Sequence, residues 1–192
     1  MLSKERNMSI DVIKIIAMLG VIMLHTTHDF MYHDGLDIAS FMYKSSVISI
    51  PLFFMSSGYL LLGRNNITYN YTLKKIIGIL RYMAFFCVCY WLIKQNFTFN
   101  SLWNIFWGSF NVEGPFFVFW YFGAMIIIYL LLPFINYIYL YFKKAYYLSI
   151  IFLLVIQNII FSYNSIIGIE TAPAALRLYN WLTYFMLGGG YI

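Results

Sequence analysis

Three ionisable residues interrupt an apolar stretch near the start of the chain: Asp11, Lys14 and His25. If residues 9–28 form a helix, each residue turns by about 100°, so the three side chains share one stripe. Lys14 and His25 are then roughly 16 Å apart along the axis. Histidine can accept a proton from a hydroxyl, and lysine can bind an anionic group. The stripe therefore predicts two different functions at opposite ends of one helix.

A carboxylate beside His25 would fix its tautomer and raise its basicity, as general-base chemistry on a hydroxyl requires. Asp29 follows His25 by four residues, which is close enough on a helix for this role. Asp11 lies too far along the helix to reach His25, and it neighbours Lys14 instead. A carboxylate from another helix is an equal alternative. We therefore predict His25 and Asp29 as a catalytic pair.

Structural interpretations of the same residues stay open. Asp11 and Lys14 form a neutralising pair, or Lys14 extends its ammonium group to the headgroups, or His25 is simply solvated. Besides the catalytic and structural interpretations, a metal site is a third one. We expect no metal, because part of the ligand set falls in a loop of unknown shape. Its candidate ligands are His25, His28, Asp29 and His33. Two further candidates, Cys87 and Cys89, lie in an apolar run and are interpreted as packing thiols.

The composition places these residues in an integral membrane protein. Of 192 residues, 62% are hydrophobic and 10% are charged, whereas a soluble domain carries about 25% charged residues. This composition excludes the soluble, disordered, collagen-like and disulfide-scaffold classes. The net charge of +5 is explained by cytoplasmic loops, so no nucleic-acid partner is expected.

The apolar stretches predict the topology, since a helix needs about 20 residues to cross a bilayer. Six candidates occur, at residues 9–28, 45–63, 76–93, 115–135, 146–162 and 178–192. A cytoplasmic N-terminus puts seven basic residues in the inner segments and three in the outer ones, as the positive-inside rule requires. The inner residues are Lys4, Arg6, Arg64, Lys74, Lys75, Lys143 and Lys144.

We therefore predict an all-α fold: a polytopic transmembrane helical bundle of about six spans with a cytoplasmic N-terminus. The bundle forms a single domain over residues 1–192. Because ionisable groups inside a span are costly, the stripe on residues 9–28 should face the bundle interior. The last apolar stretch stops without a charged or polar tail, so we expect the domain to be truncated at its C-terminus.

Aromatic residues recur at helical spacing in the segment 94–114, at Trp103, Phe106, Trp107 and Phe110. This spacing predicts a helix lying at the membrane interface, where tryptophan is enriched. An aromatic belt is one interpretation of this helix. A lid over a pocket is the other.

The pair Lys14 and His25, with ten residues between them, resembles the basic-x10-His signature of the membrane-bound acyltransferase family 3. Asp11 matches the acidic residue that precedes the basic one in that family. The chain is most similar to the N-terminal six-span portion of the surface-polysaccharide O-acetyltransferases. Further similar stretches follow in order: residues 51–62 (PLFFMSSGYLLL), 120–135 (WYFGAMIIIYLLLPFI) and 184–188 (YFMLG).

One position departs from this pattern. Proteins of this type often carry a histidine two residues before the tryptophan that Trp120 matches, and here that position is Val118. Without this histidine, the acceptor site that the resemblance implies must be completed by a different residue.

The resemblance implies an O-acyltransferase that moves an acyl group, usually acetyl, from cytoplasmic acyl-CoA to a hydroxyl of a cell-surface or lipid-linked glycan. It implies a multi-pass protein of the cell (inner) membrane. No bound cofactor is expected, because acetyl-CoA acts as the donor substrate. The expected partners are therefore acyl-CoA, the glycan acceptor and the lipid bilayer.

Acyl-CoA carries phosphates, so its cytoplasmic entrance should be basic. Lys74, Lys75 and Arg81 lie at or just inside the start of the third span, and Lys74 and Arg81 share a helix face. With Lys14 and its neighbour Asp11, they form the predicted acyl-CoA site. Ordinary positive-inside charge is the alternative for the lysines.

Three residues are assigned to packing: Ser57, Gly58 and Trp120. Small residues such as Ser57 and Gly58 let membrane helices approach closely. A nucleophilic Ser57 is the less favoured alternative, because no neighbouring base is visible in the sequence.

Two other functions compete with acyl transfer. Polar groups at opposite ends of one stripe also suit a transporter or flippase module. Such a protein should show an internal repeat and paired discontinuous helices, and the sequence shows neither. The other alternative is a catalytically incomplete fragment or an interaction subunit, which the abrupt end and Val118 support.

Overall fold

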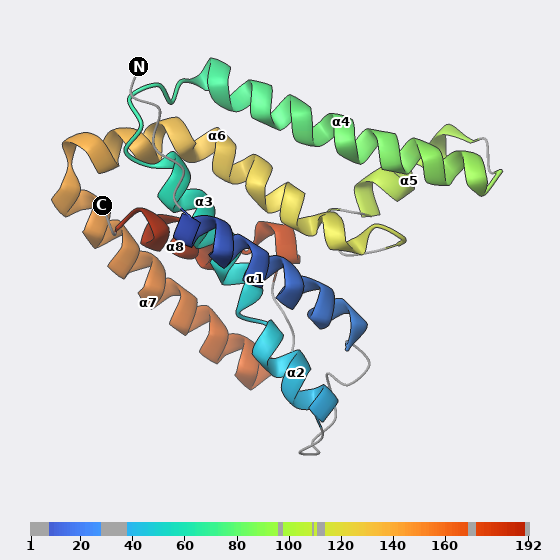
Figure 1. Cartoon of the computed structure of the whole chain (residues 1–192), viewed down its shortest axis with the longest axis horizontal. Helices are drawn as coiled ribbons and strands as arrows, with labels where there is room; N and C mark the ends of the chain where they lie inside the picture. The colour runs from blue at the N-terminus through green and yellow to red at the C-terminus, as the bar shows by residue number, and fades with distance from the viewer. Residues whose placement is uncertain are drawn as a thin grey trace. The chain divides into compact units, whose positions relative to one another are not determined.

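The structure is a computed structural model that describes residues 8–27, 38–95, 98–108, 110, 114–168 and 172–190. All regular structure in these residues is helical, which confirms the predicted all-α fold (Figure 1). The α-helices are α1 (Met8–Thr26), α2 (Ile38–Ser46), α3 (Ser49–Leu61), α4 (Tyr69–Ile93), α5 (Phe99–Gly108), α6 (Trp120–Tyr141), α7 (Lys143–Ile167) and α8 (Leu178–Gly189). Two short 3-10 helices are η2 (Phe117–Phe119) and η3 (Ala174–Leu176).

Within the described residues, five helical segments are long and apolar enough to cross a membrane. They are Met8–Thr26, Ile38–Leu61, Tyr69–Ile93, Phe117–Tyr141 and Lys143–Ile167. The chain is thus a multi-pass membrane protein. The helix at the predicted sixth stretch, α8, has 12 residues, fewer than the roughly 20 that a span requires. Six spans and the cytoplasmic N-terminus stay predictions.

Several helix boundaries differ from those that hydropathy predicts, and the reason is visible for the second and third segments. The second apolar segment contains two helices, because Val47 and Ile48 form a turn between α2 and α3. The third begins at Tyr69 rather than at residue 76, since the Thr68 hydroxyl caps the helix by accepting from the Tyr71 N–H (3.3 Å). Hydropathy marks the apolar part of a helix, whereas capping marks where its hydrogen bonds begin.

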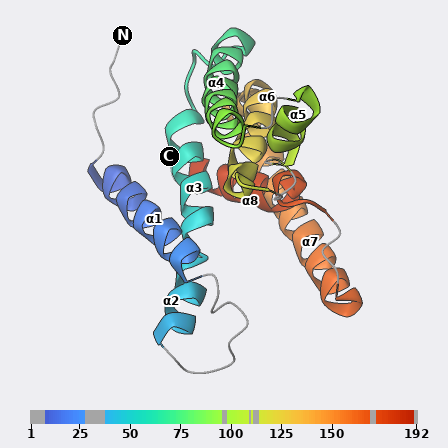
Figure 2. The same ribbon diagram turned by 90° about the vertical axis from the view of Figure 1, so that its right-hand side faces the viewer.

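The described helices form two compact units, each considered by itself: Met1–Leu62 with Tyr184–Ile192, and Gly63–Thr183. In the first unit, α1 packs against α2 and α3 (Figure 2). Glycines set these contacts. A Cβ atom added to Gly20 would overlap the Ser49 hydroxyl, and one added to Gly58 would overlap the Phe185 carbonyl oxygen. The helices are therefore as close as their backbones allow.

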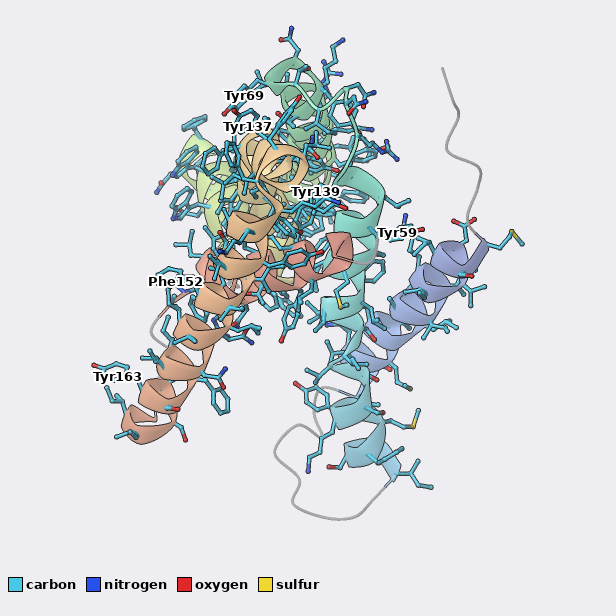
Figure 3. The ribbon with its side chains drawn as sticks, turned by 90° about the vertical axis from the view of Figure 1, so that its left-hand side faces the viewer. Tyr59, Tyr69, Tyr137, Tyr139, Phe152 and Tyr163 are labelled. Carbon is cyan, nitrogen blue, oxygen red and sulfur yellow. The ribbon has the colours of Figure 1, made fainter. Side chains whose placement is uncertain are left out.

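In the second unit, α4 packs against α5 and α6, and α6 also contacts η3 and α7. Leu132 and Ile128 of α6 and Met83 of α4 are completely buried in its core. The Tyr139 and Tyr146 rings meet edge to face, 5.0 Å apart, where α6 turns into α7. By contrast, α7 presents large apolar side chains outward along most of its length; Figure 3 labels Phe152 and Tyr163 among them.

Candidate functional site

The unbroken helix α1 carries Asp11, Lys14 and His25, as predicted for their shared stripe. Since the helix has no interruption between Lys14 and His25, they remain roughly 16 Å apart along its axis. Asp11 and Lys14 are partly exposed, and His25 is exposed in the last turn. A cationic imidazole at that position would interact favourably with the partial negative charge of the helix C-terminus.

The stripe lies beside the packed face of α1. That face consists of Ala17, Gly20 and Leu24, and its middle is about 110° of helix rotation from the middle of the stripe. On the other side of the stripe are exposed apolar residues, including Ile15 and Ile22. Within its own unit, the stripe thus occupies a flank of α1. The predicted orientation toward the interior of the whole bundle stays a prediction.

Gly20 fixes the position of the stripe. It lies between Lys14 and His25 in the sequence, at the point where α1 meets Ser49 of α3. The end of the helix is held differently, because the Thr27 hydroxyl donates to the Met23 carbonyl oxygen (2.7 Å). The close contact at Gly20 and the packing of α1 against α2 and α3 thus hold the helix that carries both predicted site residues.

The other predicted donor-binding residues, Lys74, Lys75 and Arg81, lie on α4 in the second unit. All three are exposed, so their charged groups are accessible. The Lys75 ammonium lies 5.6 Å from the centre of the Tyr71 ring, within the range of a cation–π interaction. Lys14 belongs to the first unit, so each unit carries its own part of the predicted acyl-CoA site.

A buried asparagine holds the segment that leads into this basic helix. Asn136 of α6 is 4% exposed, and both halves of its amide are used. Its Oδ1 accepts from the Gly63 N–H (2.8 Å), and its Nδ2 donates to the Arg64 carbonyl oxygen (2.9 Å). Gly63 has a φ of 79°, which suits glycine. Asn136 thereby ties the start of the α4 connection to α6.

Sequence reasoning missed Asn136, although it carries a recognisable signal. It is a single amide directly after the apolar run 124–135. A polar group without a hydrogen-bond partner would be costly at that position. Its hydrogen-bond partners are more than 70 positions away in the sequence. A polar side chain inside an apolar helix therefore predicts a hydrogen bond to a distant part of the chain.

The three residues assigned to packing differ in their surroundings. Gly58 faces the Phe185 backbone at a distance that leaves no room for a side chain. Ser57, beside it on α3, is partly exposed. The Trp120 ring lies 4.9 Å from that of Trp181, whose indole N–H donates to the Ala174 carbonyl oxygen (2.6 Å). The roles of these residues stay predictions.

The aromatic segment is helical, as its spacing predicts. The rings of Trp103 and Trp107 are stacked, with centres 6.1 Å apart and planes 9° apart. Phe106 and Phe110 meet edge to face at 5.4 Å. Whether this helix, α5, serves as a belt or as a lid remains a choice between two predictions.

Some predicted residues lie outside the described part of the chain: Asp29, His28 and His33. The catalytic pair of His25 with Asp29 therefore stays a prediction. In the ranges that the structure describes, no group of three His, Cys, Asp or Glu side chains is placed to hold a metal ion.

Comparison with known proteins adds to this geometry. The family model for the acyltransferase domain, acyltransferase family 3, matches residues 7–192. The chain belongs to this family. The match covers α1 with its Lys14 and His25 as well as every other described helix, and it confirms the resemblance that the motifs indicate. No curated protein and no solved structure matches the chain. The protein is thus an acyltransferase.

Proposed function

We propose that this acyltransferase transfers an acetyl group from cytoplasmic acetyl-CoA to a hydroxyl of a cell-surface or lipid-linked glycan, in the cell (inner) membrane. One observation carries the proposal. Lys14 and His25 stand at the motif spacing on a single uninterrupted helix, within a chain that the family model matches from residue 7 to residue 192. One end of that helix then binds the donor, and the other performs the chemistry.

His25 is proposed as the general base. Its imidazole takes the proton of the acceptor hydroxyl while the hydroxyl oxygen attacks the thioester carbonyl carbon. The carbon–sulfur bond then breaks, and the leaving CoA sulfur takes the proton back from the imidazolium. The exposure of His25 supports this role, because a general base must reach the substrate. Asp29 is proposed to orient the ring from one turn further along.

The positive side chains at the other end are proposed to bind the phosphates of CoA. Lys14 is partly exposed and Lys74, Lys75 and Arg81 are exposed, so their cations are available for charge-assisted hydrogen bonds. Asp11, three residues before Lys14, is proposed to restrain the lysine. The roughly 16 Å between Lys14 and His25 suits a donor with phosphates at one end and a thioester at the other.

The proposed reaction is tested by thioester consumption. Membranes containing the protein are given acetyl-CoA, with and without candidate glycans, and the release of free CoA thiol is followed. The proposal expects release that requires both the protein and a hydroxyl-bearing glycan, with acetyl ester appearing on the glycan in equal amount. Acyl transfer from a different donor, with acetyl-CoA untouched, would contradict it.

A further inference from the structure

An apolar hollow of about 250 Å³ lies between α4 and α5, two helices that contact each other; Figure 1 shows α5 beside one end of α4. Every side chain that lines it is apolar or aromatic. The lining residues are Ala84, Cys87 and Val88 of α4 and Phe99, Leu102, Trp103 and Phe106 of α5. None of the lining residues is among those assigned to acyl transfer.

The chemistry of the lining decides what can fill the hollow. A bound water needs two to four polar partners, and this lining does not supply them. A dry apolar cavity of about 150 Å³ is already large enough to bind benzene, so this hollow can hold an apolar group of larger size. Left empty, the aromatic rings around it would lose their dispersion contacts on one side.

The position of the hollow points to the source of that group. It lies against Ala84–Val88 of α4, and no charged residue occurs between Arg81 and Lys94 in the sequence. Val88 is about 9 Å along the helix from Lys94, at the rise of an α-helix. Trp103 and Trp107, both about half exposed, are residues typical of the membrane interface. The α4 side of the hollow thus belongs to an uncharged stretch of the candidate membrane span Tyr69–Ile93, which the acyl chains of a bilayer can reach.

We propose that the hollow binds one hydrocarbon chain of a membrane phospholipid. The chain enters between α4 and α5 and contacts the side of Trp103 and Phe106, restoring the dispersion contacts that the two helices alone leave unmade. It thereby holds the short helix α5 against α4. A transmembrane helix of a second protein is too wide for a space of this volume, since a helix with its side chains is about 10 Å across.

The test uses the wild-type protein in vesicles of phosphatidylcholine that contain a phospholipid with a photoreactive diazirine on one acyl chain. After irradiation, the labelled peptides are identified by mass spectrometry at increasing mole fractions of the probe. A binding site predicts labelling of the α5 lining residues that saturates. Lipid that merely surrounds the protein should label exposed α7 residues such as Val155 and Ile159 in linear proportion to the probe.

Three variants of α4 sharpen the test. Ala84→Phe places a ring in the hollow and should lower labelling of α5 at least fivefold. Ile77→Phe adds bulk on the same face two turns earlier, outside the hollow, and should leave labelling unchanged. Val88→Phe repeats the filling experiment if the first variant folds poorly.

In the wild-type protein, labelling of α5 that rises linearly with the probe, as it does for α7, would by itself overturn the proposal. So would unchanged labelling in both filling variants, or crosslinks from α5 to a second copy of the chain. None of these outcomes depends on acyl transfer, so the lipid site and the proposed function stand or fall separately.

Discussion

Replacing Asn136 by leucine should destabilise the second unit strongly, because the substitution leaves two backbone groups without partners. The side chain is almost completely buried, and it accepts from the Gly63 N–H and donates to the Arg64 carbonyl oxygen. Leucine has a similar size, so the change removes the hydrogen bonds without opening a large cavity. The effect measured is then the loss of those bonds.

The expected magnitude follows from the two orphaned groups. Leaving a buried donor or acceptor unsatisfied costs about 1–3 kcal/mol each. Gly63 is exposed and Arg64 is partly exposed, so water can reach the connection and each cost falls in the lower part of that range. We therefore expect Asn136→Leu to lower the free energy of unfolding by about 2–3 kcal/mol.

The assay is equilibrium unfolding in mixed micelles with a rising fraction of denaturing detergent, followed by tryptophan fluorescence. Asn158→Leu is the matched control, because Asn158 is exposed on α7 and its Nδ2 donates only within its own helix, to the Leu154 carbonyl oxygen (2.8 Å). It should change stability by no more than about 0.5 kcal/mol. Equal effects of the two substitutions, or no effect of Asn136→Leu, would refute the reasoning.

Three further predictions concern packing, topology and donor binding. Gly58→Ala should lower the free energy of unfolding by about 1–3 kcal/mol, because the new methyl group overlaps the neighbouring backbone. Gly78→Ala, with open space around it, should stabilise α4 by up to about 1 kcal/mol. Equal shifts of the two variants in the same unfolding assay would contradict this prediction. Single cysteines at Asn66 and Asn164, in a background without the native cysteines, should react with an impermeant thiol reagent from opposite sides of the membrane, and reaction from one side would overturn the six-span topology. Lys14→Met should raise the KM for acetyl-CoA while Lys14→Arg retains most activity, and a loss of kcat with KM unchanged would assign Lys14 to chemistry instead.

The sequence predicts helices well in this protein, because apolar length is a local property. The all-α fold and the aromatic helix α5 follow from composition and from the spacing of Trp103 and Trp107. Helix ends are less predictable, since they depend on individual hydrogen bonds. The cap at Thr68 lengthens α4, and the turn at Val47 and Ile48 divides the second apolar segment.

In the candidate site, too, the features within one helix are predictable from the sequence and the contacts between helices are not. The Lys14–His25 spacing is a property of one helix, so the sequence suffices to place both on one stripe. The role of Asn136 depends on Gly63 and Arg64, which only the tertiary fold brings to it. The hollow between α4 and α5 likewise forms only where the side chains of the two helices leave space between them. The residue pattern of either helix alone does not predict it.

The central claim is that His25 is the general base of the transfer, and turnover of His25 variants at saturating acetyl-CoA tests it most directly. His25→Ala should lower kcat by about 10²–10⁴-fold at an unchanged protein level in the membrane. His25→Gln should be nearly as poor, because an amide keeps a hydrogen bond but cannot take the proton. Normal turnover in His25→Ala, with its membrane level matched to that of the wild type, would contradict the claim.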